Sequence, residues 1–430
     1  MERKIYDNLL KWKEQNIKLP YMLVGARQTG KTYILTEFCK NEFQNYVYIN
    51  LENMANISKI FEETIEPEKI IQAIEITLNI SIDIKNTVIF IDEIQTSERA
   101  INSLKYFAES KEEYKIVCAG SLLGVKINRF KSSFPVGKVW IDYLYPMDFE
   151  EFLIAIDERK LNNIIKQSYE KMEPMIESVH QKALKLYNEY LCIGGMPSNI
   201  LEYIKNEKSI SKYKDDLSNI LITSYLADMS KYTENTEAIK NNKIYNSIPE
   251  QLGKENKKFK YSIVEKSARS REYETSLEWL VASNMILKCI NIKTPKSPLK
   301  AYIDNSFKIY LSDIGILRVL SKITSNEILL NKNMIYKGVL AENYVAEILY
   351  SKYKELYYWQ LGSYYEVDFV VNIDGDIIPI EVKASDNITS KSLNYYIERY
   401  KPKYSIRIST KNFGFSNNIK SIPLYAAHLI

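Results

Sequence analysis

Short apolar segments alternate with amphipathic segments of helix length in the first third of the chain. A lead-in helix over residues 2–16 has its apolar residues at helical spacing, namely Ile5, Leu9 and Trp12. From Pro20 to residue 155, strand-length apolar segments are separated by stretches long enough for a helix, and this spacing requires crossover connections between parallel strands. We therefore expect a mostly parallel sheet with strands at Tyr21–Val24, Tyr46–Asn50, Thr87–Ile91, Lys115–Ala119 and Val139–Leu144.

The periodicity changes after residue 155. Residues 156–235 predict helices almost throughout, and we expect a helical lid there with one interruption, a turn at Gly194–Pro197. Residues 236–325 predict a winged-helix-like segment, in which two short helices precede two strands: 262–271, 273–283, Lys288–Asn291 and Lys308–Leu311.

Three basic residues are expected on the second helix of that segment: Lys266, Arg269 and Arg271. On a winged helix they would contact phosphates of a nucleic acid. A basic, solvated face of an element that bridges two domains is an equally good interpretation.

From residue 326 onward the pattern predicts a small α/β domain. A helix at Lys337–Tyr350 precedes strands at Tyr357–Gln360, Glu366–Asn372, Ile377–Ala384 and Tyr404–Ser409. The predicted fold class is therefore α/β, with a parallel-sheet core, a helical lid, a winged-helix-like segment and a small C-terminal domain. Their expected limits are 1–155, 156–235, 236–325 and 326–430.

Composition narrows the candidate chemistry. A chain of 430 residues with 46% hydrophobic and 26% charged residues is typical of a globular protein of two to three domains. The net charge of +4 is too small to indicate a nucleic-acid partner by itself. The sequence has two histidines, His180 and His428, so histidine-based catalysis is nearly excluded and carboxylates, lysines and bound metal are the remaining chemistry.

The four cysteines stand far apart and form no CxxC pair, as expected for reduced thiols in the cytoplasm. The charged N-terminal residues lack the apolar core of a signal peptide, and no apolar run approaches the length of a membrane span. We expect a cytoplasmic protein with no membrane contact.

The strongest motif lies between the first expected strand and the helix expected at Tyr33–Cys39. It fits the phosphate-loop pattern G-x-x-x-x-G-K-[ST] at every position. Backbone N–H groups of such a loop surround the phosphates of ATP, the lysine contacts the β- and γ-phosphates, and the last hydroxyl ligates Mg²⁺. The expected nucleotide-binding residues are Gly25, Ala26, Arg27, Gln28, Thr29, Gly30, Lys31 and Thr32.

Two further expected strands end in polar residues. The strand at Thr87–Ile91 is followed by Asp92, a candidate Mg²⁺ ligand opposite Thr32, and by Glu93, a candidate base for the attacking water. The strand at Lys115–Ala119 is followed by Ser121, which is either a γ-phosphate sensor or an ordinary turn residue.

This order of motifs resembles an AAA-type ATPase core. Further stretches resemble the prokaryotic ATPases that carry a C-terminal DUF4143 domain: Leu144–Phe152, Tyr190–Pro197, Phe307–Leu317, Glu342–Ala346 and Glu366–Ala384. Relatives often have Gly-Arg where this chain has Gly137-Lys138, so the resemblance leaves the arginine finger open, with Arg129 as the nearest substitute.

Four charged residues of the C-terminal segment form a candidate metal site. Glu381 and Lys383 share a face of one expected strand, and a hairpin at Asp374–Asp376 brings Asp368 beside them. With the helix residue Glu342, they resemble the nuclease fold of restriction-type and Holliday-junction-resolving enzymes. The resemblance implies that Asp368, Glu381 and Glu342 hold Mg²⁺ while Lys383 steadies the reacting phosphate.

Two functions remain open at this point. In the first, ATP hydrolysis is coupled to action on DNA through the nuclease-like domain. In the second, the ATPase is a regulatory or structural switch whose C-terminal domain binds a protein partner without cutting anything. Self-association into a homo-oligomer is compatible with both.

Overall fold

The computed structural model describes residues 1–430 apart from 16, 122–134, 136, 331–333 and 385–390. The chain forms two compact units. The first contains Met1–Tyr145 with Ala282–Asn284, and the second contains Pro146–Val281 with Met285–Ile430. None of the described helices is both long enough and apolar enough to cross a membrane.

The first unit is built on a five-stranded sheet in the order β2-β3-β4-β1-β5, and every neighbouring pair is parallel. The expected parallel sheet is therefore confirmed. The strands are β1 (Tyr21–Val24), β2 (Asn45–Asn50), β3 (Thr87–Asp92), β4 (Lys115–Gly120) and β5 (Trp140–Tyr143).

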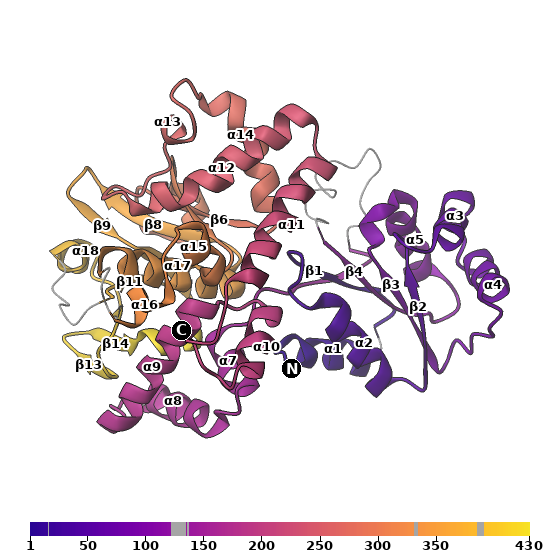
Figure 1. Cartoon of the computed structure of the whole chain (residues 1–430), viewed down its shortest axis with the longest axis horizontal. Coiled ribbons are helices and arrows are strands. Elements are labelled where there is room, and N and C mark those ends of the chain that lie inside the picture. The colour runs from indigo at the N-terminus through magenta and orange to yellow at the C-terminus, as the bar shows by residue number, and fades with distance from the viewer. Residues whose placement is uncertain (16, 122–134, 136, 331–333, 385–390) are drawn as a thin grey trace. The chain divides into compact units, whose positions relative to one another are not determined.

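Helices cover both faces of this sheet. Successive residues of a strand point to opposite faces, so the residues of β1 pack alternately against the two groups of helices. Tyr21 and Leu23 pack with apolar residues of α1 (Ile5–Glu14) and α2 (Lys31–Glu42). Met22 and Val24 pack on the other face with three helices, α3 (Ala55–Glu63), α4 (Pro67–Leu78) and α5 (Glu98–Glu109). Figure 1 shows these two groups of helices in indigo and violet. The α/β fold class is thus confirmed for the core.

The second unit begins with helices, as expected for residues 156–235. They are α7 (Phe149–Ala155), α8 (Arg159–Lys171), α9 (Glu177–Ile193), α10 (Pro197–Lys205) and α11 (Asp216–Tyr232). The expected turn is confirmed, since α9 ends directly before Gly194 and α10 begins at Pro197. A further helix follows, α12 (Asn235–Gly253).

The helices expected at 262–271 and 273–283 are shorter or shifted. They are α13 (Tyr261–Val264) and α14 (Ser270–Ala282). Lys266 and Arg269 therefore lie between the helices and not on the second one, because the chain turns there and the Glu265 carbonyl accepts the N–H of Ala268 at 2.9 Å. Only Arg271 lies on α14.

A four-stranded sheet joins the middle and C-terminal segments, with the order β7-β6-β8-β9. Its strands β6 (Ile286–Ile292) and β7 (Ile303–Leu311) form an antiparallel pair, and β6 pairs in parallel with β8 (Leu356–Leu361). The sheet thus crosses the segment limit expected at residue 325.

The single strand expected at Glu366–Asn372 is wrong. It is two strands in two sheets, β9 (Tyr365–Val367) beside β8, and β10 (Phe369–Ile373) beside β11 (Asp376–Val382). Asp368 stands at the break, where its Oδ2 accepts the backbone N–H of Val382 at 2.8 Å. The side chain thus takes the place of a ladder partner and the chain changes sheets.

The hairpin after β10 is confirmed. Asp374 and Gly375 both have positive φ angles, 51° and 91°, as the tight turn of a two-residue hairpin requires. Three further strands complete a sheet of order β10-β11-β12-β14-β13: β12 (Ser405–Ser409), β13 (Gly414–Ser416) and β14 (Ile419–Pro423). The same part of the chain contains the helices α17 (Met334–Tyr353) and α18 (Lys391–Tyr400). The sequence pattern did not predict β13 and β14.

Two of the stretches that resemble DUF4143-type ATPases, Tyr190–Pro197 and Phe307–Leu317, are in contact inside the second unit. Buried Asp313 accepts the N–H of Gly195 at 2.7 Å with Oδ2, and the N–H of Ile316 at 3.0 Å with Oδ1. The second bond caps α15 (Ile314–Leu320). Burial raises the pKa of Asp313 to about 6, although these backbone bonds favour its charged form. A Cβ atom on Gly315 would lie 2.4 Å from the carbonyl oxygen of Ile193, so this crossing requires glycine.

We expect Gly315→Ala to destabilise the second unit by about 1–3 kcal/mol, because the clash is with backbone that cannot turn aside. Gly338→Ala in α17 is the matched control. A Cβ there meets nothing within 4 Å, and alanine in a helix interior should stabilise by about 0.5–1 kcal/mol. Urea unfolding of both variants checks this, and equal midpoints would contradict it.

Candidate functional site

The phosphate loop, residues 25–32, joins β1 to α2. A Cβ atom on Gly25 would lie 2.2 Å from the carbonyl oxygen of Leu144, so the loop can approach the end of β5 only with glycine there. Gly30 has φ 94° and Gln28 has φ 61°, both in the left-handed region. Helix α2 begins at Lys31, so its free N–H groups and positive dipole end lie at the loop. The local geometry is that of an anion site.

Side chains of the loop bind its own backbone. Lys31 donates from Nζ to the carbonyl oxygens of Gly25 at 3.0 Å and Ala26 at 2.7 Å. The hydroxyl of Thr29 donates to the same Ala26 carbonyl at 3.0 Å. These bonds fix the curled backbone and keep the Lys31 ammonium inside the loop.

Thr32 and Asp92 lie together although they are far apart in the sequence. The Thr32 hydroxyl donates to Oδ2 of Asp92 at 2.9 Å, and the Tyr48 hydroxyl donates to the same oxygen at 3.0 Å. The other oxygen, Oδ1, accepts the N–H of Glu93 at 3.0 Å. A hydroxyl and a carboxylate thus stand at the carboxyl edge of the sheet, where open α/β sheets bind ligands.

Gln95 is a site residue that the sequence reasoning missed. Its Nε2 donates to Oε2 of Glu93 and, at 3.4 Å, to Oγ of Ser121. The structure therefore links the candidate base to the candidate sensor through one amide. The position of Gln95, two residues after Glu93, was the available signal.

The sequence does not indicate Arg3 either, because the pattern of residues 2–16 predicts only an amphipathic helix. The Arg3 guanidinium is buried and donates to the carbonyl oxygens of Thr29 at 2.7 Å and Tyr145 at 2.6 Å. Arg3 thus connects the phosphate loop to the backbone that follows β5. Of the two arginine-finger positions, Arg129 lies outside the described residues, and Lys138 forms an ion pair with Glu109 at 2.9 Å on the surface.

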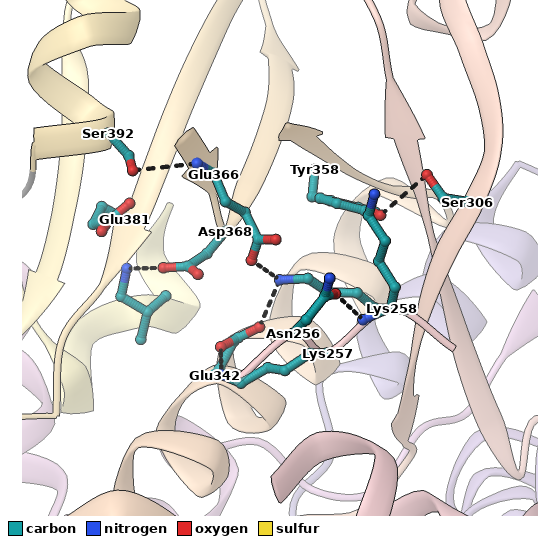
Figure 2. A network of polar contacts seen from close by, with 12 residues as sticks. Asn256, Lys257, Lys258, Ser306, Glu342, Tyr358, Glu366, Asp368, Glu381 and Ser392 are labelled. Carbon is teal, nitrogen blue, oxygen red and sulfur yellow. Dashed lines mark hydrogen bonds and ion pairs between the residues drawn. The ribbon is translucent and has the colours of Figure 1, made fainter. Parts of the chain in front are cut away.

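A second polar site lies in the second unit, and we call it the C-terminal charge cluster. Figure 2 labels five of its residues: Lys257, Glu342, Glu366, Asp368 and Glu381. The cluster combines lysines and acids from a loop, two sheets and a helix, and its members are Lys257, Lys308, Glu342, Glu366, Asp368, Glu381 and Lys383. The sequence expectation that Glu342, Asp368, Glu381 and Lys383 belong together is compatible with this arrangement, but it omitted the other lysines.

Lys308 is the centre of the cluster, with a fully buried side chain on β7. Its Nζ lies 2.6 Å from Glu366 Oε1 and 3.2 Å from Glu342 Oε1. Burial lowers the pKa of this ammonium, but the charges of Glu342, Glu366 and Asp368 outweigh burial and hold the pKa well above its ordinary value. Lys308 therefore stays charged.

Glu342 on α17 is bound from several sides. Lys257 forms an ion pair with it, and the Tyr310 hydroxyl donates to its Oε1 at 2.6 Å. Burial raises the pKa of Glu342, but Lys257 and Lys308 outweigh burial and hold the pKa well below its usual range. Glu342 is thus an ionised carboxylate whose negative charge is balanced by two lysines, Lys257 and Lys308.

Asp368 and Glu381 lie at the other side of the cluster. Burial and the neighbouring charges of Glu381 and Glu342 raise the pKa of Asp368 well above its ordinary value. Glu381 pairs with Lys383 at 2.8 Å. Among the residues that the structure describes, no group of three or more histidine, cysteine or acidic side chains has the spacing of a metal site.

A parallel sheet with a phosphate loop after one strand and an acidic residue at the end of another defines a P-loop nucleotide-binding core. Family models agree with this class. Residues 18–153 match the AAA domain, residues 184–327 match a domain of unknown function, DUF8612, and residues 337–427 match another, DUF4143. The chain therefore carries an AAA domain, the nucleotide-binding domain of ATPases, followed by DUF8612 and DUF4143.

Solved structures show more distant likenesses. The Walker-type ATPase PABY2304 of Pyrococcus abyssi is 15% identical, with 74% of this chain and 95% of that chain covered and a TM-score of 0.45. The ORC2 protein of Aeropyrum pernix is 13% identical, with coverage of 76% and 92% and a TM-score of 0.41. TM-scores below 0.5 do not establish a shared overall fold. No sequence among the curated proteins matches the chain significantly.

Replacing Lys308 should lower the free energy of unfolding of the second unit. We expect Lys308→Met to destabilise the second unit by about 3–5 kcal/mol, because it leaves the buried carboxylate of Glu342 and the partly exposed carboxylate of Glu366 with one partner fewer. Lys300→Met is the control, since Lys300 pairs with Glu355 at the surface, where its side chain is 72% exposed and a loss of at most about 1 kcal/mol is expected. Urea unfolding compares them, and similar losses would refute a structural role for the buried charge.

Proposed function

We propose that the first unit hydrolyses ATP in a Mg²⁺-dependent reaction at the carboxyl edge of its sheet. The observation that carries this proposal is the 2.9 Å contact between the Thr32 hydroxyl and the Asp92 carboxylate. Thr32 lies in the first turn of α2 and Asp92 at the end of β3, and their oxygens are the hard ligands that Mg²⁺ prefers. Bound Mg²⁺ would neutralise charge on the phosphates.

Each residue of the site has a separate task in this proposal. Lys31 and the N–H groups of residues 25–32 bind the triphosphate, and Thr32 and Asp92 hold the metal ion. Glu93 accepts a proton from the attacking water. Ser121, at the end of β4, contacts the γ-phosphate.

The base is tested by Glu93→Gln, which keeps the size of the side chain but cannot accept the proton. We expect ATP to bind normally and turnover to fall by about 10²–10⁴-fold. Lys31→Ala is the paired variant, and it should lose tight ATP binding because its ammonium supplies charge that backbone amides cannot replace. Calorimetric titration with a non-hydrolysable ATP analogue and steady-state phosphate release measure the two effects. Wild-type turnover in Glu93→Gln would remove Glu93 from the mechanism.

For the second unit, the C-terminal charge cluster supports a partner-binding scaffold better than a nuclease. Glu342 pairs with Lys257 and Lys308, and Glu381 pairs with Lys383. A nuclease would need Glu342 and Glu381 to exchange these partners for Mg²⁺ shared with Asp368, and it would need Lys383 beside the phosphate of DNA. The ion pairs oppose that exchange, since each lysine competes with the metal for the same oxygens.

Manganese titration of the full chain, free of nucleotide, separates the two roles. For a scaffold we expect no saturable Mn²⁺ binding that depends on Asp368, so Asp368→Ala should match the wild type. Asp376→Ala is the control, because Asp376 lies in the same hairpin and pairs only with surface Lys403 among the ion pairs described. Saturable binding that disappears in Asp368→Ala and persists in Asp376→Ala would favour the nuclease, as would cleavage of plasmid or branched DNA.

A further inference from the structure

Gln95 has no task in the mechanism so far, although it lies within the site. It belongs to the 3₁₀ turn η1 (Ile94–Thr96), directly after β3, and its side chain is 0% exposed. A buried amide is retained where its hydrogen-bonding groups have defined partners. Here the amide nitrogen carries two hydrogens, and the two acceptors are the Glu93 carboxylate and the Ser121 hydroxyl.

The Glu93 carboxylate requires a hydrogen-bond donor to fix its position. Glu93 is only half-buried, and its backbone has φ 52°, in the left-handed region that a glutamate rarely adopts. That conformation turns the chain away from the direction of β3 and starts η1. The carboxylate stands at the end of three rotatable bonds, so the backbone alone does not fix where its oxygens point. The bond from Gln95 restricts them.

We propose that Gln95 is a positioning residue that holds the Glu93 carboxylate in place and couples it to Ser121. This rests on the proposed function, in which Glu93 is the base and Ser121 contacts the γ-phosphate. Because one amide nitrogen serves both side chains, a displacement of the Ser121 hydroxyl by phosphate changes the position of the amide and therefore of the carboxylate. The base is thereby oriented according to whether a γ-phosphate is present.

Gln95→Met is the test, since methionine has a similar length and volume but no N–H donor. A misplaced catalytic group costs up to about 10²-fold, so we expect turnover to fall by about 10- to 100-fold while affinity for a non-hydrolysable ATP analogue and the melting temperature stay near wild type. Thr96→Val is the matched control in the same turn. The Thr96 hydroxyl bonds the backbone carbonyl of Glu93 and not its carboxylate, so turnover should not change.

A double-mutant cycle distinguishes positioning from simple packing. If Gln95 acts through Glu93, adding Gln95→Met to Glu93→Gln should slow turnover no further, because the base is already absent. A packing role would lower turnover by the same factor in both backgrounds and would overturn the proposal. If Gln95→Met melts early, Gln95→Asn replaces it, since it stays polar but is one carbon too short to hold both partners.

The two proposals fail in different ways. Wild-type turnover in Glu93→Gln refutes the proposed mechanism itself. Slow turnover in Glu93→Gln together with wild-type turnover in Gln95→Met refutes only the positioning role.

Discussion

The parallel pairing of β3, β4 and β1 is the constraint on which the nucleotide site depends. Val24 pairs with Gly120, and Ile91 pairs with Cys118, so the three strands end at the same level. The residues that follow each of these strands therefore lie at the same carboxyl edge of the sheet, although they belong to different loops. A one-residue slip of β3 would turn its side chains to the opposite face and move the Asp92 carboxylate away from Thr32.

Buried polar groups connect distant elements of the second unit inside its apolar core. Asp313 ties the turn after α9 to the start of α15, and Lys308 ties β7 to α17 and β9. These contacts give the stretches around Gly195 and Gly315 a structural role. Their glycines allow two backbones to cross, and the aspartate satisfies N–H groups that the crossing would otherwise bury.

The strands of the first unit and the phosphate loop were predictable from the sequence, because the period of apolar residues and the spacing of glycines are local signals. The hydrogen-bond partners of the side chains were not predictable. Nothing in the sequence near Glu366–Asn372 indicates that Asp368 interrupts the strand by accepting the N–H of Val382. Asp368, Glu381 and Lys383 of the C-terminal charge cluster were found from their spacing. Glu366, Lys257 and Lys308 were not, because they come from other elements and no pattern in the sequence connects them to the site. Gln95 was missed for a related reason, since only the fold brings Ser121 within its reach.

The sheet β7-β6-β8-β9 has a consequence for dissecting the protein into parts. A fragment that starts at residue 326 would retain β8 and β9 but lose β6, leaving the N–H and C=O groups of β8 along that edge without partners. It would also lose Lys308, so the carboxylates of Glu342 and Glu366 would lack their buried counter-ion. The DUF4143 region is therefore a piece of a larger folding unit, and its exposed strand edge would favour aggregation if it were produced alone.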